Sequence, residues 1–222
     1  DTEKLFRQIL ETGSDVLHIA FSSGLSGTAN AARLAAETLK EEFPDRKIIV
    51  IDSLCASLGQ GLLVDYAVRM KEAGKSMEET AQWVQDHLQN ICHLFTVDDL
   101  KYLQRGGRIS KTTALLGTMI GIKPVLHVDE EGKLVPLSKV RGRKQSIQAL
   151  VDKMEQNIGS YRSQKQPIFI SHGDCEEDAK YLAGLVKERF GYDECLINII
   201  GPTIGAHAGP GTLALFFLGD VR

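Results

Sequence analysis

The stretch VLHIAFSSGLSGT, residues 16–28, decides the fold. Its first six residues form a short apolar run, which is typical of a strand buried in a parallel sheet. A loop with three serines and two glycines follows, and an alanine-rich amphipathic pattern begins at Thr28. A strand, a loop and a helix in this order start a β-α-β unit, so the stretch predicts a parallel sheet.

The segments on either side continue this alternation. We expect helices over residues 2–10, 28–43, 59–73 and 76–88, and strands over 16–21 and 47–51. Ser76 and Glu79 have the spacing of a capping box, which marks the start of the last of these helices. Residues 1–92 are therefore predicted to form a doubly wound, Rossmann-like α/β domain with a parallel sheet.

The second half of the chain mixes hairpins with helices. Strands are expected over residues 92–97, 125–128, 133–137, 167–171, 196–200 and 212–217. Helices are expected over 112–120, 143–158 and a segment that has Asp174 as its N-cap and ends near Phe190. Loops are expected over 103–110 and 201–211, and a hairpin turn at 129–132. Residues 93–222 should form a mixed-sheet α/β domain, with a ligand cleft between the two domains.

The bulk composition narrows the class of protein. The 26 basic and 29 acidic side chains nearly balance, which argues against general nucleic-acid binding. No secretory signal or bilayer-spanning apolar run is present, and the 4 cysteines form no C-x-x-C pair, so a reducing cytoplasm is the default expectation. The chain opens at Asp1 within a helical pattern, and we expect the natural protein to begin earlier.

The Ser/Gly loop from Ser22 to Thr28 is the first candidate site. Ligands gather beyond the carboxyl ends of parallel strands, where helix N-termini offer free N–H groups to anions. The hydroxyls add donors, and the glycines let the backbone approach a ligand closely. A capped turn whose hydroxyls bind only its own backbone is equally compatible with the sequence. No general base adjoins the serines, so a nucleophilic serine is not supported.

The segment around His207 is the second candidate site. The histidine stands among small residues, glycines and prolines in residues 201–211, a composition that holds a loop in one shape. An imidazole there can donate a hydrogen bond to a carboxylate or phosphate, and its charge can change near neutral pH. A tight turn with an incidental histidine is the alternative, and we favour the binding role.

Two basic clusters are weaker candidates. Residues 105–112 are similar to a phosphate loop, but Ser110 stands where that motif requires a glycine, which excludes a Walker site. Arg141, Arg143 and Lys144 form the second cluster. Both can meet a phosphate or a partner protein, although a solvated helix start also explains the second cluster.

Three further histidines carry no site in this interpretation. His18 and His127 lie in apolar strands and are predicted to be core or edge residues. His172, Asp174 and Cys175 match no closed zinc pattern, so we expect no metal.

Several segments in this order resemble the DegV family: SSGLSGT (22–28), TVDDLKYLQRGGRIS (96–110), IKP (122–124) with VRGRK (140–144), and GAHAGPG (205–211). Together they span nearly the whole chain. The resemblance implies two α/β domains with a long-chain fatty acid between them. Some family members are the fatty-acid-binding subunits of bacterial fatty acid kinase. They hold the acyl chain while a separate kinase subunit phosphorylates its carboxylate with ATP.

The resemblance also assigns residues. It implies that the head group of the fatty acid lies at Ser22, Ser23, Gly24, Ser26 and His207, with Ser23 as the favoured hydroxyl. It implies that contacts to phosphate or to the kinase come from Arg108, Arg141 and Arg143. It further implies a monomer with no catalytic residue of its own and no cofactor besides the bound lipid.

One departure and two rival functions remain. The family's opening strand with an Asp-Ser motif and its Thr-Ser-Gln-Pro-Ser-like segment are not found here, so we expect a chain that lacks part of the first domain and one head-group ligand. Residues 115–122 and 213–218 line the tail tunnel or form ordinary core. A phosphotransferase or hydrolase of a small phosphorylated substrate could use the same loop and His207. A regulatory module that senses lipid is the third possibility.

Overall fold

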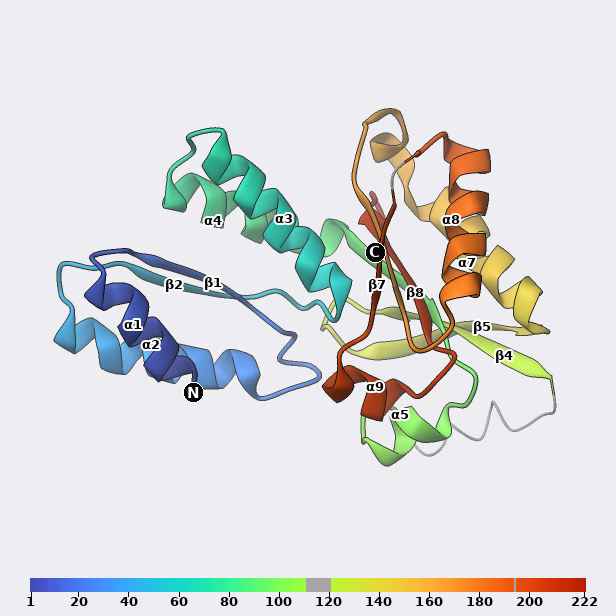
Figure 1. The fold of residues 1–222 in the computed structure, drawn as a ribbon, viewed down its shortest axis with the longest axis horizontal. Coiled ribbons are helices and arrows are strands. Elements are labelled where there is room, and N and C mark those ends of the chain that lie inside the picture. The colour runs from blue at the N-terminus through green and yellow to red at the C-terminus, as the bar shows by residue number, and fades with distance from the viewer. Residues whose placement is uncertain (111–120, 194) are drawn as a thin grey trace.

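The computed structural model describes residues 1–110, 121–193 and 195–222, which form a small sheet and a large sheet (Figure 1). The small sheet pairs two parallel strands, β1 (Val16–Ala20) and β2 (Ile48–Asp52). The helices in this part of the chain are α1 (Thr2–Glu11), α2 (Thr28–Glu42), α3 (Leu58–Glu72) and α4 (Met77–Asp86).

The large sheet has the strand order β5-β4-β3-β8-β6-β7, in which β6 and β7 run parallel and the other neighbours antiparallel. Its strands are β3 (Ile91–Thr96), β4 (Ile122–Val128), β5 (Leu134–Arg141), β6 (Ile168–His172), β7 (Cys195–Ile199) and β8 (Leu213–Leu218). The helices of this part are α5 (Lys101–Arg105), α7 (Arg143–Asn157), α8 (Glu176–Phe190) and α9 (Pro202–Ala208), with 3-10 turns at Leu88–Asn90 and Gly159–Ser163.

Helices cover both faces of the small sheet (Figure 1). On one face, Val16 of β1 packs with Phe6 of α1 and Leu39 of α2. On the other face, Ile19 and Ile51 belong to an apolar cluster that also includes residues of α3, α4 and the large sheet. Burial on both faces explains why these strands read as continuous apolar runs in the sequence.

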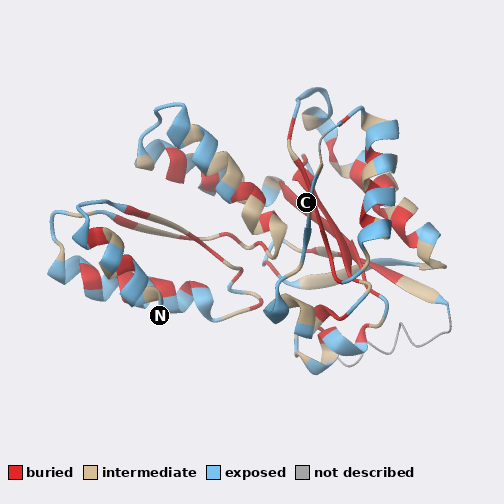
Figure 2. Ribbon diagram, viewed as in Figure 1, coloured by how far each residue is buried: buried red, intermediate tan, exposed pale blue. Residues whose placement is uncertain are grey.

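The large sheet separates two cores, because its central strands β3 and β8 are buried along their whole length (Figure 2). Side chains alternate between the faces of a strand. In β8, Leu213, Leu215 and Phe217 face the core formed with α7 and α8. Ala214 and Phe216 face the opposite side, on which α3 packs. This second face looks toward the small sheet.

Most of the predicted architecture is confirmed. The chain has the predicted α/β class with one parallel and one mixed sheet, the β4–β5 hairpin, and the capping box at Ser76. The helix predicted over 112–120 lies outside the described residues. The domain boundary after residue 92 stays a prediction; β3 begins at Ile91, and α3 contacts strands of both sheets. No helix in the described ranges has the length and apolar character needed to cross a bilayer.

Two segments predicted as loops contain helices. Residues 101–105 form α5, which overlaps the start of the loop predicted over 103–110. The Asp99 carboxylate accepts the N–H of Lys101 at 2.8 Å and satisfies a free donor of the first turn. Residues 202–208 form α9, which starts with Pro202 at a position where proline is favoured. The glycine content of this segment hid the helix from sequence reasoning.

The predicted N-cap at Asp174 is wrong. Asp174 has a φ of 56°, in the left-handed region, and Cys175 is the residue that precedes α8. The turn is held from outside: the N–H of Gly173 donates to Thr212 at 2.8 Å, and the N–H of Gly211 donates to Gly173 at 2.7 Å. Aspartate tolerates this conformation better than most residues, and its side chain is left exposed to solvent.

Candidate functional site

A cavity of about 330 Å³ lies between the small sheet and the large sheet. Loops that follow β1 and β2 form one wall, and the large sheet with α5 and α9 forms the other. Most of the lining is apolar, and its larger apolar side chains include Phe21, Leu25, Phe95, Leu134, Ile204 and Phe216. A concave, mainly apolar site with a few polar groups is the usual form of a small-molecule pocket.

The floor of the cavity is the face of the large sheet that looks toward the small sheet. His93 and Phe95 of β3, Ala214 of β8 and Ser171 of β6 all line it. Ala214 pairs with Phe95 on one side and with Ser171 on the other. The small side chains of Ala214 and Ser171 leave the space that larger residues would fill.

Polar side chains gather where the Ser/Gly loop meets α9. Ser26, Thr28, Arg108, Thr203 and His207 all line the cavity. The Ser26 Oγ lies 2.6 Å from the Thr28 Oγ1, at the start of α2. The five side chains offer hydroxyl, guanidinium and imidazole groups, which are donors suited to a carboxylate or a phosphate. We call them the polar rim.

Arg108 is held at the rim by backbone carbonyls. Its Nε donates to the carbonyl of Leu25 at 3.0 Å, and its Nη1 donates to the carbonyl of Gly106. Gly106 also lies against the imidazole, because a Cβ built on it would be 2.1 Å from the Nδ1 of His207. Only glycine permits this close approach. The contact brings His207 next to the loop that carries Arg108.

Ser22, Ser23 and Gly24 lie outside the cavity lining. The Ser22 hydroxyl is buried and donates to the carbonyl of Gly132 at 2.8 Å, in the turn between β4 and β5. Ser23 is exposed, and its backbone N–H donates to the Asp52 carboxylate at 3.1 Å. Gly24 packs closely on the same turn. The structure therefore places Ser26 and His207 together at the cavity, whereas these three residues connect the small sheet to the hairpin.

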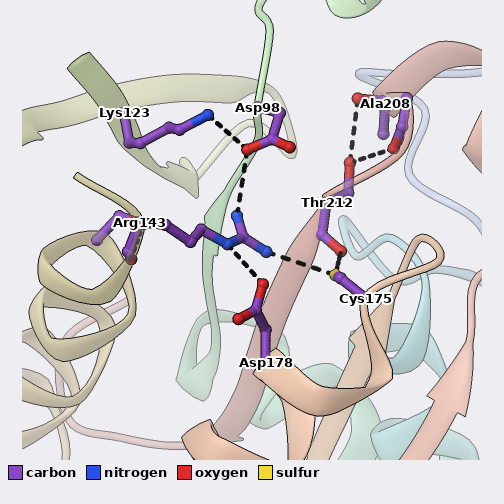
Figure 3. A network of polar contacts seen from close by, with 9 residues as sticks. Asp98, Lys123, Arg143, Cys175, Asp178, Ala208 and Thr212 are labelled. Carbon is purple, nitrogen blue, oxygen red and sulfur yellow. Dashed lines mark hydrogen bonds and ion pairs between the residues drawn. The ribbon is translucent and has the colours of Figure 1, made fainter. Parts of the chain in front are cut away.

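Arg143 and Arg141 also lie away from the cavity. Arg143 begins α7, and its Nε donates to the Asp178 carboxylate at 2.8 Å (Figure 3). It also lies 3.8 Å from Asp98, which pairs with Lys123. This network connects α7 to the start of α8. Arg141 is exposed at the end of β5.

Sequence reasoning missed His93, which lines the floor and is buried. Its Nδ1 lies 3.0 Å from the carbonyl of Ile91, and its Nε2 accepts the N–H of Ala56 at 3.2 Å. Burial, with a smaller contribution from Arg222, lowers the pKa of His93 to about 3. The imidazole is thus a neutral link between β3 and the loop before α3. The sequence offered one signal for this position: His93 lies on the same face of the strand as the apolar residues Ile91 and Phe95.

The other histidines do not assemble a metal site. Within residues 1–110, 121–193 and 195–222, no cluster of three or more histidine, cysteine or acidic side chains has the geometry to hold a metal ion. The His172 Nδ1 accepts the N–H of Cys175 at 3.3 Å. His18 packs edge-on against Phe6 with ring centroids 5.1 Å apart, and burial lowers its pKa.

Comparison with known proteins places this geometry in a family. The profile described as "Uncharacterised protein, DegV family" matches residues 1–220. A DegV domain-containing protein of Clostridium perfringens is 46% identical over 217 residues, which are 98% of this chain and 74% of the relative. Another from Lactococcus lactis is 38% identical over 213 residues, covering 96% of this chain and 73% of the relative.

Solved structures with the same fold carry lipid. A fatty-acid-binding DegV family protein of Thermus thermophilus is 30% identical with a TM-score of 0.85, covering 98% of this chain and 75% of that one. The B3 protein of Streptococcus pneumoniae fatty acid kinase, loaded with linoleic acid, is 26% identical with a TM-score of 0.89, covering 99% and 76%. A stearic-acid-binding protein of Eubacterium ventriosum is 26% identical with a TM-score of 0.87, covering 99% and 75%.

Proposed function

Because the chain belongs to the DegV family, we propose that it binds a long-chain fatty acid in the cavity between its two sheets. The observation that carries this proposal is the pairing of an apolar cavity with a polar rim at one side. Burying ~15 methylenes at ~0.8 kcal/mol each gives a gross gain of about 12 kcal/mol, before the cost of ordering the chain. An acyl tail therefore matches the lining far better than a small polar substrate does.

We place the carboxylate of the fatty acid at the polar rim. A carboxylate removed from water needs several donors, and an opposite charge lowers the cost further. Arg108 supplies the charge, while Ser26, Thr28 and His207 supply donors. Of the hydroxyls that the resemblance assigned to the head group, only Ser26 lines the cavity, so we propose that Ser26 and Thr28 bind the carboxylate in place of Ser22 and Ser23.

We further propose that the bound acid is presented to a separate kinase subunit, which phosphorylates its carboxylate with ATP. The similarity to a protein of Streptococcus pneumoniae fatty acid kinase supports this step. Exposed cations outside the cavity, including Arg141 and Lys144, offer contacts for the partner. Among the described residues that line the cavity there is no aspartate or glutamate, which disfavours the rival hydrolase with paired carboxylates.

The test is mass spectrometry of an organic extract of the purified protein, followed by titration of the delipidated protein with stearic acid. We expect a stoichiometric fatty acid in the extract. Arg108→Met should weaken stearate binding by about tenfold or more, since a buried carboxylate loses its counter-charge. Arg141→Met, an exposed control, should bind stearate normally and lose rate only in an assay with a kinase subunit. An empty extract and no binding of stearate would overturn the proposal.

A further inference from the structure

Two serines lie in the interior of the cavity, apart from the polar rim. Ser57 precedes α3, and Ser171 stands in β6 on the floor. Their Oγ atoms are 3.1 Å apart although the residues are 114 positions apart in the sequence. Ser171 is only 1% exposed, and Ser57 is half-buried. Burying a hydroxyl at such a depth costs free energy unless its hydrogen-bonding groups have partners.

The pair lies deeper than the polar rim. Thr212 marks the rim end of the floor, because its hydroxyl donates to the carbonyls of Ala208 and Gly209 at the end of α9. Ser171 pairs with Ala214, two residues further along the chain. At roughly 3.4 Å per strand residue, the serines lie about 7 Å beyond Thr212. A fatty acid with its carboxylate at the rim would pass them partway along its chain.

Ser57 is held in an unusual conformation to reach this position. It occupies the N-cap of α3, where a serine normally accepts an N–H of the first turn, yet it makes no such bond. Its φ of 52° and ψ of −136° lie outside the regions that L-residues favour. Leu54, in the same loop, also has a φ of 52°. Strained backbone of this kind concentrates at ligand sites.

The hydrogen bonds of the pair leave one donor over. Two hydroxyls carry two hydrogens, and their mutual bond uses one of them. Neither Oγ has another acceptor or donor among the described residues. Water can serve the second hydrogen while the cavity is wet, but a hydrocarbon tail displaces that water and offers nothing in return.

From these observations we propose that Ser57 and Ser171 form a hydroxyl-recognition site, which makes the cavity selective for fatty acids that carry a hydroxyl group partway along the chain. The inference rests on the proposed function, since it needs the acyl chain in this cavity. The ligand oxygen accepts the spare hydrogen of the pair and donates its own hydrogen to a serine lone pair. A ligand hydroxyl at the right carbon therefore satisfies the hydrogen bonding of the serine pair and its own, whereas an unsubstituted acyl tail leaves the spare serine hydrogen without an acceptor.

The experiment measures the affinity of the delipidated protein for stearic acid and for stearic acids that each carry one hydroxyl at a different carbon. We expect one narrow range of positions to bind about tenfold more tightly than stearic acid itself. Ser171→Ala and Ser57→Gly should remove this preference, so that the hydroxylated acids bind no more tightly than stearic acid does. Ser57→Gly also relieves the positive φ, so it should fold at least as stably as the parent protein.

Ser146→Ala is the matched control. Ser146 is also a buried serine, but it lies on α7 at the opposite face of the large sheet, and its loss should leave the preference intact. Equal affinity for all the acids in the parent protein would overturn the inference and leave the proposed function standing. A preference that survives in both Ser171→Ala and Ser57→Gly would also overturn it. Failure of every acid to bind would instead overturn the proposed function itself.

Discussion

The two faces of the large sheet are built from the same strands but are packed differently. On the face covered by α7 and α8, β8 presents Leu213, Leu215 and Phe217, all of which are buried. On the face toward the small sheet, β8 presents Ala214 and Phe216, and a cavity of about 330 Å³ remains. Large side chains fill the space on the first face, whereas on the second face the small side chains of Ala214 and Ser171 leave space beside Phe216. In β8, Leu213, Leu215 and Phe217 thus contribute to the stability of the core, whereas Ala214 and Phe216 contribute to the cavity.

The largest expected effect comes from exchanging side-chain size on neighbouring positions of β8. Leu215→Ala should lower the free energy of unfolding by about 2–5 kcal/mol, because it opens a void in a filled core. Ala214→Leu should change the free energy of unfolding by less than about 1 kcal/mol, because its added methyl groups enter existing space. The same variant should weaken stearate binding by about tenfold or more. Urea unfolding and lipid titration of both variants measure these effects.

The comparison would fail if Ala214→Leu were the more destabilising of the two. It would also fail if Leu215→Ala, while still folded, lost lipid as completely as Ala214→Leu. Either result would mean that the two faces form one packing unit. The difference in side-chain size between the two faces would then not correspond to a difference in their contributions to stability and to lipid binding.

Much of the fold could be predicted from the sequence, because side chains packed in a filled core leave a pattern in the sequence. Apolar runs such as residues 16–21 and 47–51 belong to strands covered by helices on both sides, and such burial leaves a direct trace in composition. The hairpin at 129–132 and the cap at Ser76 were also readable, because both depend on residues close together in the chain.

The site was only partly readable, because cavity contacts are set across long sequence separations. Which hydroxyls of the Ser/Gly loop face the cavity depends on Gly132, which lies 110 residues after Ser22. The carbonyl of Gly132 accepts the hydrogen bond of the Ser22 hydroxyl. No local pattern contains that information. Likewise, His93 is an isolated polar residue in an apolar strand, and its partner Ala56 is 37 residues away. His207 was found from the glycines, prolines and small residues around it, and the resemblance assigned a role to Arg108.

An intermediate effect should come from His93 on the open face. Burial lowers its pKa to about 3 in the folded protein, whereas an unfolded histidine titrates near 6.5. Between these values the unfolded chain binds the extra proton, so the protein loses stability as the pH falls through this window. We expect a loss of about 2 kcal/mol from this residue between about pH 7 and pH 5. Urea unfolding at both pH values measures it.

His93→Gln isolates this contribution, because burial also lowers the pKa of His18 and His127. The variant should be less stable at neutral pH yet lose less further stability on acidification. His127→Gln is the matched control, since that imidazole is only half-buried and should remove a smaller part of the pH dependence. An unchanged pH dependence in His93→Gln would show that the histidine is not kept neutral by the floor of the cavity.

The smallest effect tests the contact that joins the open face to the small sheet. Ser22→Ala removes the hydrogen bond to the Gly132 carbonyl, which is buried, and should cost about 1 kcal/mol of unfolding free energy. Ser23→Ala alters only an exposed side chain and should stay within about 0.5 kcal/mol of the parent protein. Neither variant should change the affinity for stearic acid by more than about twofold, because neither side chain lines the cavity. If Ser23→Ala instead weakened binding as much as Arg108→Met, the head group would lie at the serines that the sequence pointed to.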